Sequence, residues 1–242
     1  MKNFNLQDSA HLLVPGSILI GSIIVAGSIM FGARTIAHSG SAAATIPVQD
    51  QKIAVDSSKV NAVGEPIVGD PKAKLTIAYW FDYQCPFCKK LDDESVSKIV
   101  DEYVKAGKAK IVFKDFQFLG PDSQRLGLVA RAVWNIAPDK FFAWHRAIFV
   151  NQGRENSGWA TTEAIRSISA SVLGGDLADR AISLADKDAL GGYARAISAD
   201  RTEGSKFGVN STPTLVIGHK TIVGAEPYET IKAAIDAALA DK

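Results

Sequence analysis

The only two cysteines among the 242 residues lie three positions apart, in the segment Cys85-Pro86-Phe87-Cys88. Two thiols on one turn of a helix can reach each other, so this C-x-x-C spacing suits a disulfide that opens and closes. A chain with few cysteines that keeps both of them in one motif indicates that the two thiols react with each other. The same spacing also supplies half of a metal site, and the surrounding sequence has to separate these possibilities.

A zinc site is the alternative for the cysteine pair. Structural zinc needs four protein ligands, which usually come in pairs at close spacing. The chain has four histidines, and no two of them are paired in this way. One of them, His145, lies on an apolar helical stripe and is expected to belong to the core. We therefore expect no metal, and no cofactor other than the Cys85–Cys88 disulfide itself.

The local pattern places the cysteines between a buried strand and a helix. Residues 74–82 are β-branched and aromatic with few polar interruptions, which is typical of a strand buried on both faces. Residues 89–106 carry apolar side chains at helical spacing, and residues 110–116 predict a second strand. This order predicts a parallel pair joined by a crossover helix, the core of an α/β sheet. A C-x-x-C directly after the first strand of such a unit is typical of thioredoxin-like redox motifs.

The remaining C-terminal sequence predicts a block of helices followed by two strands and a helix. Helical spacing extends over residues 123–206, with glycine and proline at the breaks. Residues 214–239 predict two short antiparallel strands and a closing helix. We therefore expect residues 61–242 to form one thioredoxin-like α/β domain with a helical insertion at about residues 121–207.

The N-terminal sequence predicts a membrane segment. Residues 12–33 contain no charged side chain, and a run of about 20 apolar residues can span a bilayer as a helix. A cleaved export signal is the alternative, with small residues at 42–44, although these lie well beyond the apolar run. A buried core helix would show a polar stripe, which this run lacks. We expect a tail at 1–11, an anchor or signal at 12–33, and a flexible linker at 34–60.

Charge and compartment limit the partners. The chain has 27 Lys and Arg against 26 Asp and Glu, so it lacks the basic excess that nucleic-acid binding requires. A redox pair behind an N-terminal export segment fits an oxidising compartment. We therefore place the catalytic domain outside the cytoplasm, in the cell envelope. It would be anchored to the membrane or, as the alternative, cleaved and secreted.

The position of the motif assigns different chemistry to the two thiols. Cys85 is expected at the N-terminal end of a helix that begins around Pro86, where unpaired N–H groups and the helix dipole favour negative charge. Both effects lower the thiol pKa and raise the population of the attacking thiolate. Cys88, one turn further in, is expected to be less exposed and to resolve the mixed disulfide formed on Cys85. Phe87, between them, is the candidate for an exposed apolar contact with unfolded substrate.

Four segments resemble the DsbA-like branch of the thioredoxin superfamily, the disulfide oxidoreductases of the bacterial envelope. Residues 80–90, WFDYQCPFCKK, resemble its active-site segment in a D-x-x-C-P-x-C form. Residues 141–149 resemble its helical insertion, residues 208–218 its cis-proline loop, and residues 222–228 its closing turn. The similarity extends from about residue 74 to the C-terminus, with the segments in the expected order.

The resemblance implies that Thr212-Pro213 is a cis peptide facing the cysteines, with the Thr212 backbone free to pair with an extended substrate chain. Without the resemblance, Pro213 would be a proline at the start of a strand. Several relatives carry a buried acid six residues before the first cysteine, where this chain has Tyr79. The nearest acid is Asp82, which is expected to be a solvated strand-end charge or a partner of the helix N-terminus, with a proton relay as the alternative. Lys114 is expected at a strand edge, with tuning of the site as the alternative.

The leading function is that of a thiol–disulfide oxidoreductase acting on exported, cysteine-containing proteins, with disulfide formation as the favoured direction. A reductase or a disulfide isomerase would use the same site, since residue types alone do not set a reduction potential. A second alternative is a non-enzymatic, membrane-tethered module that binds unfolded chains, as a chaperone does. Because the chain has no further cysteine, a redox partner protein or a small thiol must recycle the pair.

Overall fold

The computed structural model describes residues 54–188 and 191–241, which belong to the second of the two units, Gln51–Lys242, into which the chain divides. The predicted tail, the predicted membrane segment and most of the predicted linker therefore lie outside the described residues. Among the helices in the described ranges, none is both long enough and apolar enough to cross a membrane.

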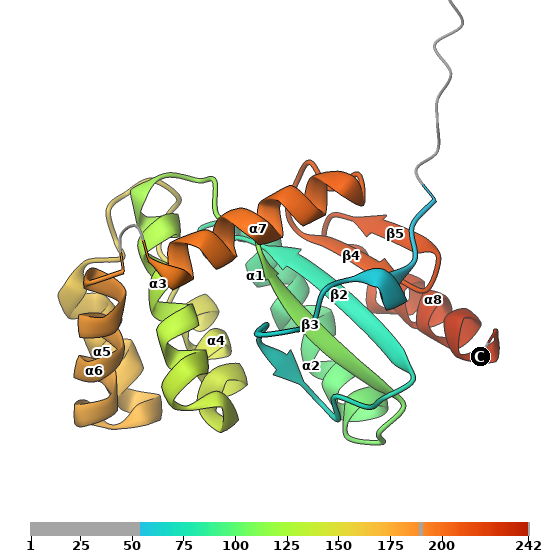
Figure 1. Cartoon of the computed structure of the whole chain (residues 1–242), viewed down its shortest axis with the longest axis horizontal. Helices are drawn as coiled ribbons and strands as arrows, with labels where there is room; N and C mark the ends of the chain where they lie inside the picture. Colours follow the sequence, from blue (N-terminus) through green and yellow to red (C-terminus); the bar gives the residue numbers. More distant parts are fainter. Residues whose placement is uncertain (1–53, 189–190, 242) are drawn as a thin grey trace, which may run out of the picture. The chain divides into compact units, whose positions relative to one another are not determined.

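A five-stranded sheet, in the order β1-β3-β2-β4-β5, forms the centre of the described unit (Figure 1). The strands are β1 (Ile67–Val68), β2 (Leu75–Phe81), β3 (Ala109–Asp115), β4 (Thr214–Ile217) and β5 (Lys220–Val223). β2 and β3 are parallel, as predicted, and β4 lies antiparallel on the other side of β2. Every residue of β2 is buried, which explains why its sequence shows no polar alternation.

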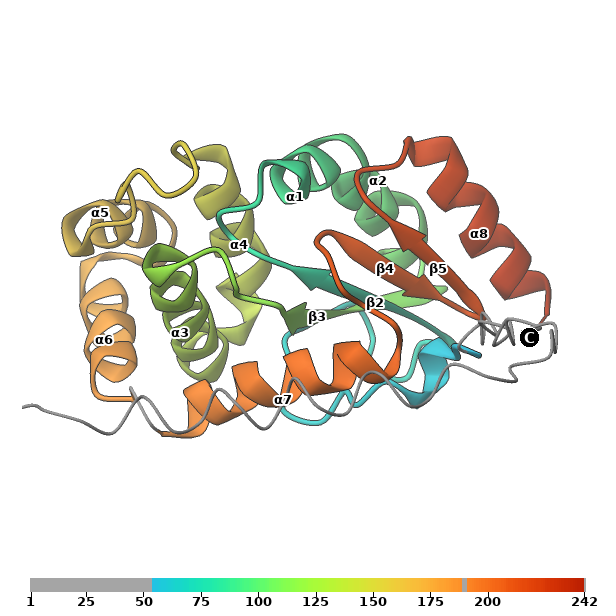
Figure 2. The same ribbon diagram turned by 90° about the horizontal axis from the view of Figure 1, so that it is seen from above.

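Helices cover both faces of the sheet. The crossover between β2 and β3 is one helical run, in which π-helical turns follow α1 (Pro86–Leu91) and α2 (Ser97–Ile99). Figure 2 shows these helices and α8 (Tyr228–Ala240) on one face of the sheet, with α7 (Gly192–Lys206) on the other. The cysteine motif therefore begins at the junction between the central strand and the helical layer.

The predicted helical insertion is confirmed. Between β3 and β4 the chain forms α3 (Pro121–Ile136), α4 (Phe141–Val150), α5 (Thr162–Leu173), α6 (Gly175–Asp186) and α7. Helices α3 to α6 lie together beyond the edge of the sheet, and α7 returns along its face to contact β3 (Figures 1 and 2). The insertion brings α4 and the start of α3 against the segment that carries the cysteines.

Residues 54–60 correct the predicted start of the domain. They were expected to be linker, but Val55 and Val60 are buried and Ser57–Lys59 forms a short 3-10 helix. The Ser57 N–H donates to the Gly218 carbonyl (2.8 Å), and the Gly218 N–H donates to the Ser57 hydroxyl (2.9 Å). The boundary at residue 61 was therefore placed too late, because the partners of this segment come from the other end of the domain.

Lys114 contradicts its predicted place at a strand edge. Its strand, β3, lies inside the sheet between β1 and β2, and its side chain is fully buried. Its ammonium group contacts the carboxylates of Glu65 (3.1 Å), Glu203 (2.9 Å) and Asp200. We call this cluster the buried ion network; its members are Lys114, Arg131, Glu65, Asp115, Asp200 and Glu203.

Candidate active site

The cysteine motif lies where the central strand passes into α1. Cys85 has an extended backbone (φ −72°, ψ 118°) and caps the helix, and Pro86 is the first helical residue. The carbonyl of Cys85 accepts hydrogen bonds from the N–H groups of Cys88 (3.1 Å) and Lys89 (3.2 Å). Both thiols are free. The predicted place of Cys85 at a helix N-terminus is confirmed, and with it the positive end of the helix dipole.

Cys85 is held as a thiolate. Its pKa falls from an ordinary 9.0 to about 6, mainly because the Cys88 thiol donates a hydrogen bond to its sulfur, and against the opposing effect of burial. The side chain of Thr212 and the backbone N–H groups of Cys88 and Phe87 lower the pKa further. These donors come from the first turn of the helix and from one distant loop.

Cys88 has the opposite character. It is fully buried, compared with 5% exposure for Cys85, so the predicted difference in exposure is confirmed. Burial, followed by the interaction with Cys85, raises the pKa of the Cys88 thiol well above its ordinary value. The pair therefore combines one thiolate near the surface with one protonated thiol beneath it.

The loop before β4 completes the site. The Thr212–Pro213 peptide bond is cis, as the family resemblance implied. The carbonyl oxygen of Thr212 lies 3.4 Å from the sulfur of Cys85. Antiparallel pairing explains this contact between residues 127 positions apart, because Trp80 in β2 is opposite Thr214 in β4. The start of β4 is thereby placed beside the end of β2.

Asp82 is a buried anchor between loops. Its carboxylate accepts hydrogen bonds from the N–H groups of Gln84 (2.8 Å), Phe118 (2.8 Å) and Leu119 (3.0 Å), and from the Ser123 hydroxyl. Full burial contradicts the predicted solvated strand-end charge. These donors tie the segment before Cys85 to the loop after β3 and to the first turn of α3, and neither thiol is among them. We therefore assign Asp82 to the support of the motif.

His145 lies in the core, as predicted, but it also has polar partners. Its Nδ1 lies 3.1 Å from the Tyr83 hydroxyl, and its Nε2 lies 3.3 Å from the carboxylate of Asp92. Asp92 in turn lies 3.1 Å from the guanidinium of Arg146. Within residues 54–188 and 191–241, no group of three or more His, Cys, Asp or Glu side chains is placed to hold a metal ion.

The structure also places residues at the site that the sequence did not indicate. The side-chain amide of Gln152, in the loop after α4, donates to the carbonyls of Tyr83 (2.8 Å) and Cys85 (3.1 Å). Tyr79 of β2 places its hydroxyl beside Cys88. The position of Tyr79 six residues before Cys85 was a sequence feature that could have indicated its role. No such feature marks Gln152, because it lies 67 residues from Cys85.

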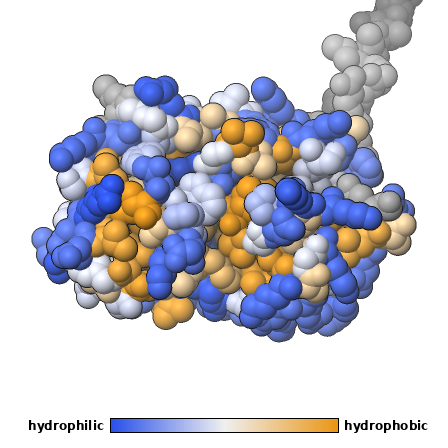
Figure 3. Space-filling model, turned by 60° about the horizontal axis from the view of Figure 1, so that its bottom comes forward, coloured by the Kyte–Doolittle hydropathy of each residue, from blue (hydrophilic) through white to orange (hydrophobic). Residues whose placement is uncertain are grey.

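Two exposed apolar side chains lie in or beside the motif. Phe87 is 61% exposed, as predicted, and its contact with unfolded substrate stays a prediction. Val150 is also exposed, and its carbonyl accepts a hydrogen bond from Lys89 of α1 (3.1 Å). Figure 3 shows one face of the protein, on which apolar residues gather over the helical insertion and over the part that contains the sheet.

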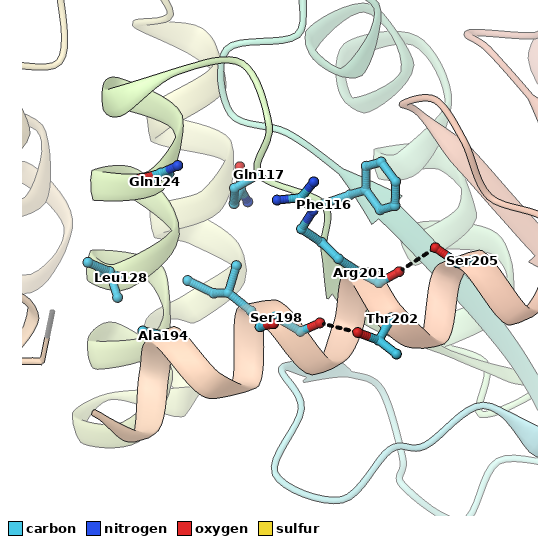
Figure 4. A pocket seen from close by; sticks show the side chains of 10 residues that line it. Phe116, Gln117, Gln124, Leu128, Ala194, Ser198, Arg201, Thr202 and Ser205 are labelled. Atoms are coloured by element: carbon cyan, nitrogen blue, oxygen red, sulfur yellow. Dashed lines mark hydrogen bonds between the residues drawn. The ribbon is translucent and has the colours of Figure 1, made fainter. Parts of the chain in front are cut away.

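A separate cavity of about 470 Å³ lies between α3 and α7. Figure 4 shows Arg201 of α7 extending toward Gln117 and Phe116, and its guanidinium carbon lies 5.8 Å from the centre of the Phe116 ring. Neither cysteine lines this cavity. Gln117 connects it with the motif, because its side chain accepts the N–H of Tyr83 (3.3 Å). The cavity is therefore a neighbour of the active site and not a part of it.

The central sheet, the helical insertion and the cis-proline loop facing Cys85 define a protein of the thioredoxin-like fold with a cysteine pair built for redox exchange. A family model described as Thioredoxin matches residues 61–237. The chain therefore belongs to this thioredoxin family, within its DsbA-like branch.

Relatives and solved structures agree with this placement. The disulfide bond formation protein D of Bacillus subtilis is 26% identical over 194 residues, which cover 77% of this chain and 82% of the relative. The crystal structure of oxidised BdbD from Bacillus subtilis is similar with a TM-score of 0.67 and 25% identity, over 77% of this chain and 98% of that one. DsbA of Chlamydia trachomatis has a TM-score of 0.63 over 74% of this chain and 93% of its own; at 19% identity this likeness shows the fold alone.

Proposed function

We propose that this protein catalyses disulfide formation in exported proteins, with Cys85 and Cys88 as its redox pair. The observation that carries the proposal is the opposite ionisation of the two thiols beside the Thr212–Pro213 loop. A stabilised Cys85 thiolate stabilises the reduced form of the pair. The oxidised form is therefore a better electron acceptor, and so an oxidant of other thiols. The similarity to disulfide bond formation protein D supports this direction.

The reaction proceeds through two thiol–disulfide exchanges. A substrate thiolate attacks the Cys85 sulfur of the oxidised pair, the S–S bond breaks, and Cys88 leaves with the electron pair and takes a proton. A second substrate thiolate then attacks the substrate sulfur of the mixed disulfide, and Cys85 leaves as a thiolate. The substrate gains a disulfide and the pair gains two electrons. The pair itself supplies the redox chemistry, so we propose no further cofactor.

Each supporting residue has a place in this scheme. Pro86 begins the helix whose N–H groups stabilise the departing Cys85 thiolate. We place the extended substrate chain beside Thr212, whose carbonyl lies 3.4 Å from the Cys85 sulfur, and Pro213 holds this loop at the start of β4. Phe87 offers an exposed apolar contact to unfolded substrates.

A pair of serine variants tests the proposal. Oxidised wild-type protein is expected to restore activity to reduced, unfolded ribonuclease, while Cys85→Ser and Cys88→Ser each lose this activity completely. Cys88→Ser keeps the nucleophile but cannot resolve the mixed disulfide, so only this variant is expected to accumulate covalent complexes with substrate on non-reducing gels. Complexes in Cys85→Ser but not in Cys88→Ser would reverse the roles.

Two measurements separate the alternatives. Equilibration with glutathione is expected to show a pair that is more oxidising than glutathione; a midpoint close to that of cytosolic thioredoxin would instead indicate a reductase. The binding-module alternative draws on the exposed side chains of Phe87 and Val150. It requires the Cys85→Ser, Cys88→Ser double variant to keep the whole biological activity, whereas the oxidoreductase loses it.

We also propose that the thioredoxin-like domain lies outside the cytoplasm. A redox partner protein or a small thiol would recycle its cysteine pair there. The support for this location is the uncharged run at residues 12–33 together with a pair suited to an oxidising compartment. Protease added to spheroplasts is expected to digest the domain, and spheroplasts made permeable by detergent provide the control. A domain that resists protease until detergent is added would place it in the cytoplasm.

A further inference from the structure

Tyr79 lies directly beneath the redox pair. Its side chain is fully buried, and its ring packs against those of Phe81 and Phe113, with centroids 5.3 and 5.8 Å away. This packing fixes the hydroxyl at Cys88, where it donates a hydrogen bond to the carbonyl oxygen (3.4 Å). The hydroxyl therefore lies beside the buried residue whose sulfur leaves and attacks during the exchange reaction.

The hydrogen bond from Tyr79 to the Cys88 carbonyl is weak. A distance of 3.4 Å is long for a hydroxyl donor, whose hydrogen bonds to oxygen are usually about 2.7–2.8 Å. The same carbonyl already accepts the backbone N–H of Asp92. The hydroxyl carries one proton, and that proton is available to the Cys88 sulfur when the sulfur is charged.

Tyr79 keeps this proton. Burial, followed by the neighbouring Cys88 and Asp92, raises the pKa of the Tyr79 hydroxyl well above its ordinary value. The carboxylate of Asp92 lies 3.3 Å from His145 and 3.1 Å from the guanidinium of Arg146. Tyr79 can therefore donate a hydrogen bond but does not act as a base.

We propose that Tyr79 is a catalytic residue of the exchange reaction, because its hydroxyl donates a hydrogen bond to the Cys88 sulfur whenever that sulfur is a thiolate. The inference rests on the proposed function of the pair. Cys88 is a thiolate when it leaves the attacked disulfide and, in the reverse direction, when it attacks a mixed disulfide on Cys85. In a buried site such a charge is costly without a donor. The backbone of Asp82 supplies one hydrogen bond, and Tyr79 supplies a second.

The charge balance of the step is unchanged by Tyr79. The S–S bond of the pair breaks, its electron pair stays on Cys88, and the proton that later neutralises Cys88 comes from solvent. The phenol lowers the energy of the thiolate without giving up its proton. Because Cys88 is a thiol in the resting reduced pair, the hydrogen bond acts on the transition state and hardly on the equilibrium between the oxidised and reduced forms.

The test uses Tyr79→Phe, which removes the hydroxyl and keeps the ring. Reduced protein is mixed with oxidised glutathione, and oxidised protein with reduced glutathione, and both reactions are stopped with acid and followed by mass spectrometry. Loss of the hydrogen bond is expected to lower the population of the Cys88 thiolate about tenfold, which corresponds to about one pKa unit. Because nucleophilicity offsets part of this change, with a Brønsted coefficient of about 0.4–0.5, each rate is expected to fall about threefold. The glutathione equilibrium constant is expected to stay within about twofold, since both directions slow alike.

Tyr83→Phe is the matched control. It removes another fully buried hydroxyl near the motif, one whose partner is His145 and not a thiol. Its two rates are expected to equal those of the wild type. Unchanged rates in Tyr79→Phe would overturn the inference. So would a fall in one direction only, because that changes the equilibrium and points to a displaced Cys88 instead of a lost hydrogen bond.

A second variant tests the inference if Tyr79→Phe does not fold. Site-specific Tyr79→3-fluorotyrosine keeps the hydroxyl and makes it a stronger donor, so both rates are expected to rise, and rates that do not rise would overturn the inference. Glutathione exchange reports on the pair itself. It therefore tests Tyr79 even if the ribonuclease experiment shows that exported proteins are not the substrates.

Discussion

Alkylation of reduced Cys85 by iodoacetamide is expected to follow a titration curve with its midpoint near pH 6, because the pKa of this thiol is lowered to about 6. At pH 7 about 90% of Cys85 would be thiolate, compared with about 1% for a thiol of ordinary pKa. The measurement is the alkylation rate between pH 4 and pH 9, with the label located by mass spectrometry.

Cys88→Ala is the control for this titration. The Cys88 thiol is the largest cause of the lowered Cys85 pKa, so its removal is expected to move the midpoint to higher pH. A wild-type midpoint above pH 8 would contradict the site described here. It would mean that the helix N-terminus and the Thr212 loop do not stabilise the thiolate.

The same ionisation makes the stability of the reduced protein depend on pH. The folded pKa of Cys85, about 6, lies below the ordinary 9.0 of an unfolded chain. The resulting stabilisation is fully present above pH 9 and is lost as the pH falls through about 6. The oxidised protein has no thiol to ionise. The melting temperature of the reduced form is therefore expected to rise relative to that of the oxidised form between pH 5 and pH 8, and a constant difference would contradict the linkage.

Lys114→Met is expected to lower the free energy of unfolding by about 3–5 kcal/mol. Burial lowers the pKa of Lys114, but the carboxylates of Asp200 and Glu65 raise it more, so the ammonium group stays charged inside the protein. Removing Lys114 leaves Arg131 as the one cation of the network, so part of its buried carboxylate charge loses its compensation, and this produces the large loss. Urea unfolding of the oxidised protein measures the change.

Lys105→Met is the matched control for Lys114. Lys105 forms an ion pair with Asp101 (2.7 Å), but both side chains are largely exposed. Such pairs contribute about 1 kcal/mol or less, so the control is expected to unfold almost as the wild type does. If Lys114→Met lost no more than Lys105→Met, the buried ion network would not be a major source of stability. The network joins β3 to α7 and includes neither thiol, so exchange rates of the folded variant are expected to be retained.

Local features of the chain were predictable from its sequence. The unbroken apolar run at residues 74–82 became β2, and the helical spacing that follows became the crossover helix. Cys85 at a helix N-terminus follows from these two elements together with Pro86, because proline favours the first helical position. The cis bond before Pro213 was available only through the family resemblance, since no periodicity marks it.

Errors arose where partners come from distant parts of the chain. The short strand β1 is too brief to show a period, and residues 54–60 have a composition typical of a linker while their hydrogen bonds reach Gly218. A lysine in a strand is usually solvated, and no feature of the sequence around Lys114 indicates that Glu65 and Asp200 contact its ammonium group. Asp82 is a similar case, because its donors include residues 118, 119 and 123.

The sequence by itself determined that Cys85 and Cys88 form a redox pair, which thiol lies at the start of the helix, and which strand positions the pair, because these properties depend on residues close together in the chain. Only the tertiary structure decided what surrounds each thiol. Thr212 meets Cys85 because β4 pairs with β2, and Tyr79 meets Cys88 because α1 packs on the central strand. The pKa of a buried group depends on its neighbours in space, and these neighbours are set by how the sheet and helices pack.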